Sequence, residues 1–301
     1  MAAKRNRLGG VVPATVTPFT PDEKINASAM LALMRWNCGQ GVDSFFIGGS
    51  SAECFLLSPD ERRETFEIAA ELRDRAYLIA HVGAVSTREA EDYARCAVRL
   101  GYDAIAATPP FYYGYGSKEI CSYYYDIAQA AGKPVIIYNF PGNTGKNFDL
   151  SDKNYIKLLQ SGLILGIKHT NQVVYQLERI KHINPELIMM NGFDETMVAG
   201  LALGADGSIG STFNFMYPHY RSIYDAFQSK QIEEALDLQI KANNIMNALC
   251  DVGLIPAIKY VLTTMGIDAG VPRRPFRALD EEQKRYIDTV VRSNLMRQLC
   301  P

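Results

Sequence analysis

The chain has 301 residues, of which 48% are apolar and 21% are charged, and its formal net charge is −2. That apolar fraction is typical of a globular protein and excludes a disordered chain. The balanced charge argues against a nucleic-acid-binding protein, which would carry a basic face. The length allows either two domains of ordinary size or one α/β barrel of about 250 residues.

The sequence predicts neither export, nor a membrane span, nor a metal centre. The basic residues of Met1–Arg7 precede no uninterrupted apolar segment of the signal-peptide kind, and no run reaches the ~18 apolar residues of a membrane helix. The six cysteines lack CxxC pairing, and the four histidines lack HxH and HExxH spacing. We therefore expect reduced thiols in a cytoplasmic protein without a catalytic metal.

Eight short apolar segments alternate with helical patterns along most of the chain. Each segment is a continuous apolar run, which is typical of parallel strands that are covered on both faces. The predicted strands are Val11–Thr15, Ser44–Gly48, Tyr77–His81, Ala104–Ala107, Val135–Asn139, Leu163–Lys168, Leu187–Gly192 and Gly207–Gly210.

Helix start and stop signals lie between these segments. Ser58 and Glu61 have the spacing of a capping box, and Ser86 and Glu89 repeat it. Gly101 is placed to end the second of these helices.

The alternation predicts an α/β fold of the (β/α)₈ TIM-barrel type. A doubly wound sheet is the alternative, weakened because no GxGxxG motif follows any strand. Beyond about Met216 the pattern is helical only, so we expect a catalytic barrel over residues 1–225 and a C-terminal helical extension over residues 226–301 that packs on it. The helices predicted in this part are Tyr220–Phe227, Ile232–Leu249, Pro256–Met265 and Glu281–Leu299.

The C-terminal ends of the strands hold the active site in a barrel of this kind. Lys168 ends the apolar run 163–168, where desolvation disfavours the ammonium form of a lysine. A neutral lysine amine can attack a carbonyl group and form a Schiff base. A structural lysine that reaches solvent or pairs with a carboxylate is the alternative, and this segment alone leaves both open.

Three other strand ends carry polar groups, and each also has a structural interpretation. Tyr138 can relay a proton, or it can be a rim residue. The glycines and two hydroxyl groups of Gly48–Glu53 can hold a carboxylate, or they can form an ordinary turn. Asp194 and Glu195 can bind a polyhydroxylated ligand, or they can cap the next helix.

Motifs in a fixed order cover nearly the whole chain, namely Ala14–Phe19, Gly49–Glu53, Thr108–Tyr113, Tyr138–Pro141 and Gly166–Lys168. In these motifs the chain resembles the pyruvate-dependent class I aldolase family, which includes N-acetylneuraminate lyase and dihydrodipicolinate synthase. The segments most similar to the N-acetylneuraminate lyase branch are Ala80–Gly83, Asn191–Glu195 and Gly207–Thr212.

Two residues depart from the family pattern. Asn143 stands where the synthases usually carry an arginine and the lyases an apolar residue, so the sugar acid handled can differ from N-acetylneuraminate. Ala52 replaces a glycine, and a positive φ at this position would strain or reshape the loop.

The resemblance implies a Schiff-base aldolase that cleaves a 2-oxo sugar acid, such as N-acetylneuraminate, to pyruvate and an aldehyde, such as N-acetylmannosamine. Lys168 would form the Schiff base, Tyr138 would act as acid and base, and Ser51 would join the proton relay. The implied substrate-binding residues are Ser50, Ser51, Thr170, Gly192, Asp194, Glu195 and Ser211, with Asn143 in the specificity region.

The resemblance also implies a homotetramer in which Tyr112 reaches toward a neighbouring subunit's site. It implies no cofactor and no metal, because the Schiff base on the lysine is the electron sink. Another pyruvate aldolase or dehydratase on the same scaffold, either a 2-keto-3-deoxy sugar acid aldolase or a dihydrodipicolinate synthase-like enzyme, is the nearest alternative. A catalytically silent sugar-acid-binding barrel is the other, supported by Ala52 and opposed by the retention of Lys168 and Tyr138.

Overall fold

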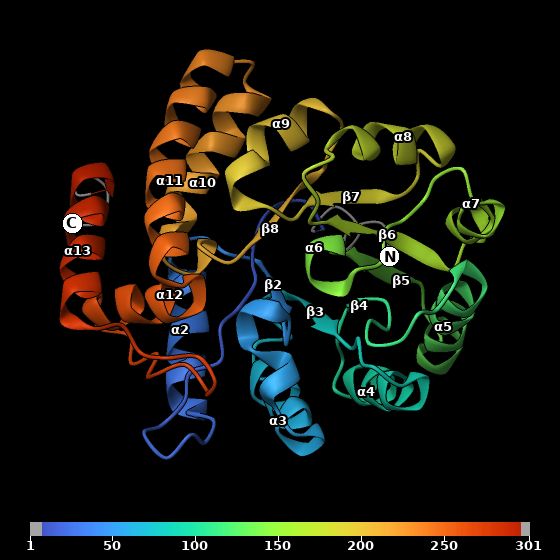
Figure 1. Cartoon of the computed structure of the whole chain (residues 1–301), viewed down its shortest axis with the longest axis horizontal. Coiled ribbons are helices and arrows are strands. Elements are labelled where there is room, and N and C mark those ends of the chain that lie inside the picture. Colours follow the sequence, from blue (N-terminus) through green and yellow to red (C-terminus); the bar gives the residue numbers. More distant parts are fainter. Residues whose placement is uncertain (1–7, 296–301) are drawn as a thin grey trace.

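A computed structural model describes residues 8–295, in which eight parallel strands form a nearly closed barrel surrounded by helices (Figure 1). The strands follow the order β1-β8-β7-β6-β5-β4-β3-β2 around the sheet. A single parallel bridge from Ala14 to Phe46 joins β1 to β2, and the Thr15 amide donates to the Phe46 carbonyl at 3.0 Å. The predicted TIM barrel is confirmed. The strands are β1 Gly10–Pro13, β2 Ser44–Ile47, β3 Tyr77–His81, β4 Ala104–Ala107, β5 Val135–Asn139, β6 Ile164–His169, β7 Ile188–Asn191 and β8 Gly207–Gly210.

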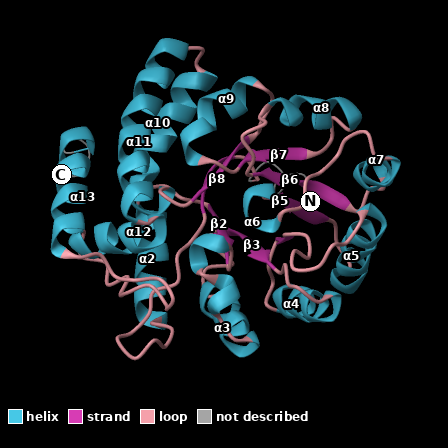
Figure 2. Ribbon diagram, viewed as in Figure 1, coloured by secondary structure: helices cyan, strands magenta, loops and turns pink. Residues whose placement is uncertain are grey.

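Eight of the helices surround or cap the barrel, and a ninth, α10, joins it to the C-terminal part of the chain (Figure 2). These helices are α2 Ala27–Gly39, α3 Pro59–Ala70, α4 Thr87–Arg99, α5 Ser117–Ala131, α6 Pro141–Thr144, α7 Lys153–Gln160, α8 Tyr175–Ile183, α9 Met197–Ala202 and α10 Phe213–Gln228.

The two predicted capping boxes have different outcomes. At the start of α3, the Glu61 amide donates to Ser58 Oγ at 3.3 Å, and the Ser58 amide donates to Glu61 Oε2 at 2.8 Å, so this box is complete. At α4, Ser86 caps the Glu89 amide, but the Glu89 carboxylate instead accepts from the Tyr93 hydroxyl at 2.5 Å. The second box is therefore only half formed, because a tyrosine one turn along the helix binds the glutamate.

Alternate residues of the strands form two apolar layers. One set, which includes Val12, Phe46, Ile79 and Tyr138, forms a cluster inside the barrel. The other set packs against the surrounding helices in a larger cluster. The parallel strands are thus buried on both faces, which is the physical reason for their continuous apolar sequences.

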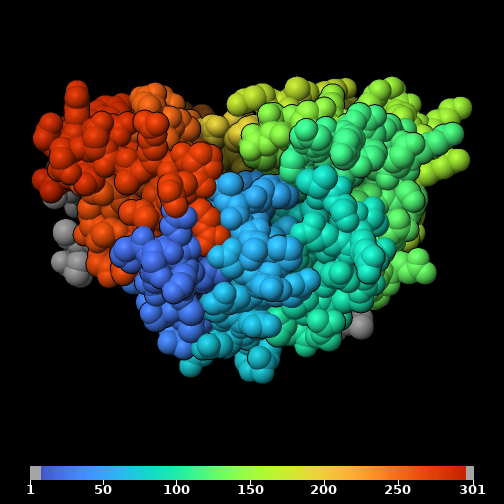
Figure 3. All heavy atoms as spheres, turned by 60° about the horizontal axis from the view of Figure 1, so that its bottom comes forward, coloured from blue at the N-terminus to red at the C-terminus, as the bar shows by residue number. Residues whose placement is uncertain are grey.

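The C-terminal helices are α11 Ile232–Val252, α12 Leu254–Thr264 and α13 Glu281–Leu295. At one side of the barrel α11 and α12 pack against α10, and α13 packs against α11 and α12. Figure 3 shows the same region against the N-terminal part of the chain, red beside blue and cyan. The predicted division after residue 225 falls inside α10, and the division into residues 1–225 and 226–301 stays a prediction.

No single described helix is long and apolar enough to span a membrane, although the bent pair α11–α12 has the required length and composition when taken together.

Some sequence predictions fall on residues outside the described range 8–295. They are the basic segment Met1–Arg7, the thiol of Cys300 and the predicted helix end at Leu299. The described cysteines are free thiols, as predicted: Cys38, Cys54, Cys96, Cys121 and Cys250.

Candidate active site

Lys168 lies inside the barrel near the C-terminal end of β6, and its side chain is only 4% exposed. The parallel register places it opposite Tyr138 of β5. Its Nζ lies 4.0 Å from the centre of the Tyr138 ring and 4.6 Å from that of Phe46. No described carboxylate forms an ion pair with Lys168, and the side chain does not reach bulk solvent. Lys168 therefore neither reaches solvent nor pairs with a described carboxylate, which were the two structural alternatives.

Tyr138 links Lys168 to the loop that follows β2. Its hydroxyl lies 3.4 Å from Ser50 Oγ, and its ring stacks on Phe140 with a centroid distance of 5.8 Å. Ser50 begins a short 3₁₀ turn, Ser50–Ala52, which places Ser51 at the same cavity. One contact between hydroxyl groups thus connects Ser50, a carboxylate-binding candidate, to the phenol beside the lysine.

A cavity of about 330 Å³ lies at this end of the barrel and brings together nearly all the predicted site residues. Its lining includes the predicted residues Ser50, Ser51, Tyr138, Asn143, Lys168, Thr170, Gly192, Asp194, Glu195 and Ser211. Tyr112 is the exception, because its side chain is 75% exposed and lines no part of this cavity. A second cavity of about 320 Å³ shares Ser50, Phe140 and Asn143 with the first. The two cavities are therefore adjacent.

A larger cavity of about 540 Å³ lies at the opposite end of the barrel, beside the first residues of β1 and β7. None of the predicted site residues lines it. The position of catalytic groups at strand C-terminal ends in this fold favours the smaller cavity around Lys168 as the candidate site.

The backbone of the loop after β2 differs from the expectation at Ala52. The left-handed residue is Glu53, with φ 58° and ψ 32°, and Ala52 lies in the 3₁₀ turn before it. A non-glycine residue in this region costs about 1 kcal/mol or more and persists only when its surroundings hold it. The alanine is therefore unstrained, and Glu53 is the residue that needs support.

Asp194 and Glu195 are adjacent but lie in different environments. Asp194 is buried and accepts hydrogen bonds from the amides and hydroxyls of Ser211 and Thr212, at 2.6–3.4 Å. Burial raises its pKa, and the bonds from Thr212 oppose that shift. Glu195 has a buried Oε2 atom with no hydrogen-bond partner among residues 8–295, and burial raises its pKa as well. Asp194 thus organises the loop before α10, whereas Glu195 keeps an oxygen available at the cavity.

Position 192 must be a glycine because the Thr170 side chain lies against it. A Cβ atom at position 192 would lie 1.9 Å from Thr170 Oγ1, so no larger residue fits without moving the threonine. That Oγ1 atom is buried at the cavity and lacks a hydrogen-bond partner among the described residues. The glycine therefore allows a threonine hydroxyl to be presented to the cavity.

His81 lies beside the site, and the sequence pattern gave no indication of this beyond its place in the segment Ala80–Gly83. Its ring lies 5.7 Å from that of Tyr138 and is fully buried. Nδ1 lies 2.9 Å from the Gly48 carbonyl, which can only accept, and the Thr108 amide donates to Nε2 at 3.3 Å. Burial, together with the nearby Arg62 charge, lowers its pKa well below the usual value. A neutral histidine therefore fixes the start of the serine loop.

The C-terminal helices also contribute to the cavity wall, which their sequences did not indicate. The side chains from this part of the chain are Met246, Cys250, Leu254, Ile255 and Phe276. Gln239 of α11 donates to the Asp194 carbonyl at 3.1 Å, and Asn243 donates to the Glu195 carbonyl at 3.1 Å.

Among the described residues, no group of three or more histidine, cysteine or acidic side chains is arranged to hold a metal ion.

A model of the dihydrodipicolinate synthetase family matches residues 7–294. The chain belongs to this family. It is 42% identical over 276 residues to the N-acetylneuraminate lyase of Rhizobium meliloti (strain 1021), with 91% of each protein covered.

Solved structures of the family have the same fold as this chain. CdNal from Clostridium difficile in complex with mannosamine matches with a TM-score of 0.92 and 35% identity, covering 95% of this chain and 99% of that one. The N-acetylneuraminate lyase from Fusobacterium nucleatum complexed with pyruvate matches with a TM-score of 0.90 and 32% identity, covering 98% and 100%. The family resemblance drawn from the motifs is confirmed.

The different environments of Asp194 and Glu195 predict different effects on stability. In Asp194→Asn, one N–H of the new amide must face a backbone N–H of Ser211 or Thr212, so we expect a loss of about 2–3 kcal/mol in the free energy of unfolding. Glu195→Gln should change it by less than about 1 kcal/mol, since no hydrogen bond to its Oε2 is lost. Urea unfolding of both variants measures this difference. Equal losses of unfolding free energy in the two variants would contradict the different environments of Asp194 and Glu195.

Proposed function

We propose that this member of the dihydrodipicolinate synthetase family is a Schiff-base aldolase that cleaves a 2-oxo sugar acid, such as N-acetylneuraminate, to pyruvate and an aldehyde, such as N-acetylmannosamine. The observation that carries the proposal is the position of Lys168, buried at a strand end with its Nζ 4.0 Å from the Tyr138 ring. The N-acetylneuraminate lyases among its relatives support the same reaction.

The reaction begins when the neutral amine of Lys168 attacks the C2 carbonyl of the open-chain 2-oxo acid. Tyr138 then gives its proton to the departing hydroxyl group, so that water leaves, a protonated imine remains on Nζ and a phenolate remains at Tyr138. The Ser50 and Ser51 hydroxyls and the amides of their turn, which lie at the cavity, are proposed to hold the substrate carboxylate. The ring faces of Phe46 and Tyr138 lie beside Nζ and stabilise the positive charge of the imine.

Cleavage then draws the electron pair of the C3–C4 bond toward the imine. The C4 hydroxyl loses its proton to Tyr138, directly or through the substrate carboxylate, and the aldehyde leaves. The enamine that remains is protonated at C3, and water hydrolyses the imine to release pyruvate and free Lys168. No cofactor takes part, because the protonated imine is the electron sink.

The polyol tail of the substrate is proposed to lie along the wall formed by β6, β7 and β8. Thr170 and Glu195 each present a buried oxygen without a described partner, and Ser211 lines the same wall. Asn143 lies at the rim of both cavities, where it adds a polar group to the specificity region. Asp194 is proposed to act in this wall by orienting Ser211.

Borohydride trapping tests the Schiff base. Treating the protein with pyruvate and borohydride should add one pyruvyl-derived mass, because reduction makes the imine bond to Lys168 permanent. Peptide mass spectrometry locates the adduct. Lys168→Ala should abolish it, whereas Lys284→Ala, which removes a surface lysine of α13, should retain it. A wild-type protein that forms no adduct refutes the aldolase proposal.

The choice of substrate is tested by comparing cleavage of N-acetylneuraminate with cleavage of 2-oxo-3-deoxy sugar acids that have shorter tails. Glu195→Gln should lower kcat/KM for N-acetylneuraminate by about 10-fold, because a charged acceptor for tail hydroxyls is lost, and should change the short acids less. A wild-type preference for the short acids would reject N-acetylneuraminate as the substrate and leave the Schiff-base chemistry intact.

We also propose that the chain forms a homotetramer in which Tyr112 reaches a neighbouring subunit's site. Tyr112 and Tyr113 are 75% and 60% exposed, which is unusual for aromatic side chains that lie next to a functional cavity. Both side chains project from the loop between β4 and α5, beside Phe111 of the second cavity.

Light scattering of the purified protein should give four times the 33.5 kDa mass of the chain. Tyr112→Ala should lower this mass or reduce kcat about tenfold, because a contact between subunits is lost. Tyr175→Ala removes a similarly exposed tyrosine from α8 and serves as the control. A monomeric wild-type protein with full activity contradicts the assembly.

A further inference from the structure

A fully buried ion pair joins the C-terminal extension to the serine loop of the site. Lys259 of α12 places its Nζ 2.6 Å from Glu53 Oε1, and both side chains are 0% exposed. Lys259 lines none of the cavities around Lys168. Removing one member of such a pair leaves a buried charge without compensation, so the two residues constrain each other strongly.

Glu53 needs this constraint because of its backbone. It is the left-handed residue that ends the Ser50–Ala52 turn, and it is not a glycine. Its Oε2 accepts from the Arg273 amide at 2.7 Å, so both carboxylate oxygens are bound by residues of the C-terminal extension. The turn itself is also held from the barrel, where Thr17 donates to the Ala52 carbonyl at 3.0 Å.

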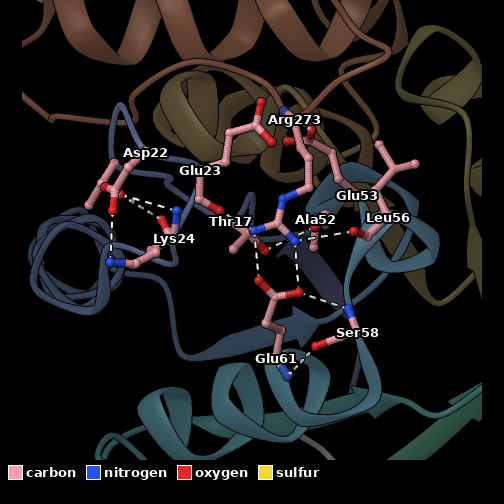
Figure 4. Close-up of polar contacts among 11 residues, drawn as sticks. Thr17, Asp22, Glu23, Lys24, Ala52, Glu53, Leu56, Ser58, Glu61 and Arg273 are labelled. Atoms are coloured by element: carbon pink, nitrogen blue, oxygen red, sulfur yellow. Dashed lines mark hydrogen bonds and ion pairs between the residues drawn. The ribbon is translucent and has the colours of Figure 1, made fainter.

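Arg273 extends the same attachment to the residues that follow the turn. Figure 4 shows its guanidinium group between the Glu61 carboxylate and the backbone near Leu56. It contacts the two Glu61 oxygens at 2.8 and 2.7 Å and the Leu56 carbonyl at 3.1 Å, and it donates to the Glu23 carbonyl. The segment from Glu53 to Glu61 is therefore fixed along its length by one residue of the extension.

These contacts determine where the two serine hydroxyls lie. Ser50 Oγ is 3.4 Å from the Tyr138 hydroxyl, and Ser51 lies one residue before Ala52. A change of backbone conformation at Glu53 would rotate the turn and move both hydroxyls away from Tyr138 and the cavity.

We infer that Glu53 and Lys259 are positioning residues for substrate carboxylate binding: their buried ion pair holds the Ser50–Ser51 turn in register with Tyr138 and Lys168. This inference rests on the proposed aldolase function. It gives the C-terminal extension a specific part in the reaction, through a lysine that does not touch the cavity.

The test uses the full chain and pyruvate as the probe. The fraction of protein trapped by borohydride is measured against pyruvate concentration for wild type, Lys259→Met and Lys284→Met. Lys259→Met should raise the half-saturating pyruvate concentration by about tenfold, because the carboxylate contacts depend on the turn geometry. The fraction trapped at saturating pyruvate should match that of wild type, since Lys168 is untouched. Lys284→Met, which breaks an ion pair on the protein surface, should leave both quantities unchanged.

Two further variants separate positioning from simple loss of stability. Glu53→Gln keeps the shape of the side chain, and it replaces Lys259→Met if that variant does not fold. In the double variant Glu53→Gln with Lys259→Met, the half-saturating concentration should rise no further than in the worse single variant, because both changes break one constraint. Wild-type trapping with an unchanged half-saturation in folded Lys259→Met or Glu53→Gln overturns this inference alone. Absence of wild-type trapping overturns the aldolase proposal and this inference with it.

Discussion

The parallel register of β5 with β6 is the constraint on which the rest of the site depends, because it places Tyr138 opposite Lys168. Successive strand residues point to opposite faces, so a slip of one residue between these strands would turn one of the two side chains out of the barrel. The register on the other side of β6 requires Gly166, since a Cβ atom there would lie 2.1 Å from the Ile188 carbonyl oxygen. The glycine therefore lets β7 approach β6 closely.

Polar contacts, several of them buried, connect the C-terminal helices to the barrel at the same end. Gln239 and Asn243 bind the backbone of the Asp194–Glu195 turn, and Lys259 binds Glu53. Burial lowers the pKa of Lys259 to about 8 and raises that of Glu53, while each partner's charge opposes the other's shift. Such pairs contribute little net stability compared with apolar packing, but loss of either partner leaves a buried charge without compensation. The extension is therefore part of the site rather than a separate module.

The sequence could predict the features that a local pattern of residues determines. Continuous apolar runs revealed all eight strands, because parallel strands are buried on both faces, and the strand ends then pointed to Lys168 and Tyr138. The pattern could not reveal the pairing of Glu53 with Lys259, which lie far apart in the chain. It also could not show that the left-handed residue of this loop is Glu53 and not Ala52, since φ depends on the contacts that hold the loop. The available signal was Lys259, the single charged residue of helix α12.

Lys168 and Lys259 show why residue type and burial alone do not decide function. Both are buried, and their Nζ atoms lie 4.0 Å from the Tyr138 ring and 4.1 Å from the Phe19 ring respectively. The Glu53 carboxylate lies 2.6 Å from Lys259 Nζ, so the charge of this lysine is compensated and its amine is held in an ion pair. Lys168 has no such partner among the described residues and faces a cavity large enough for a small substrate. Pairing with a carboxylate, the structural alternative for Lys168, thus occurs at Lys259, and the unpaired amine is the one proposed to form the Schiff base.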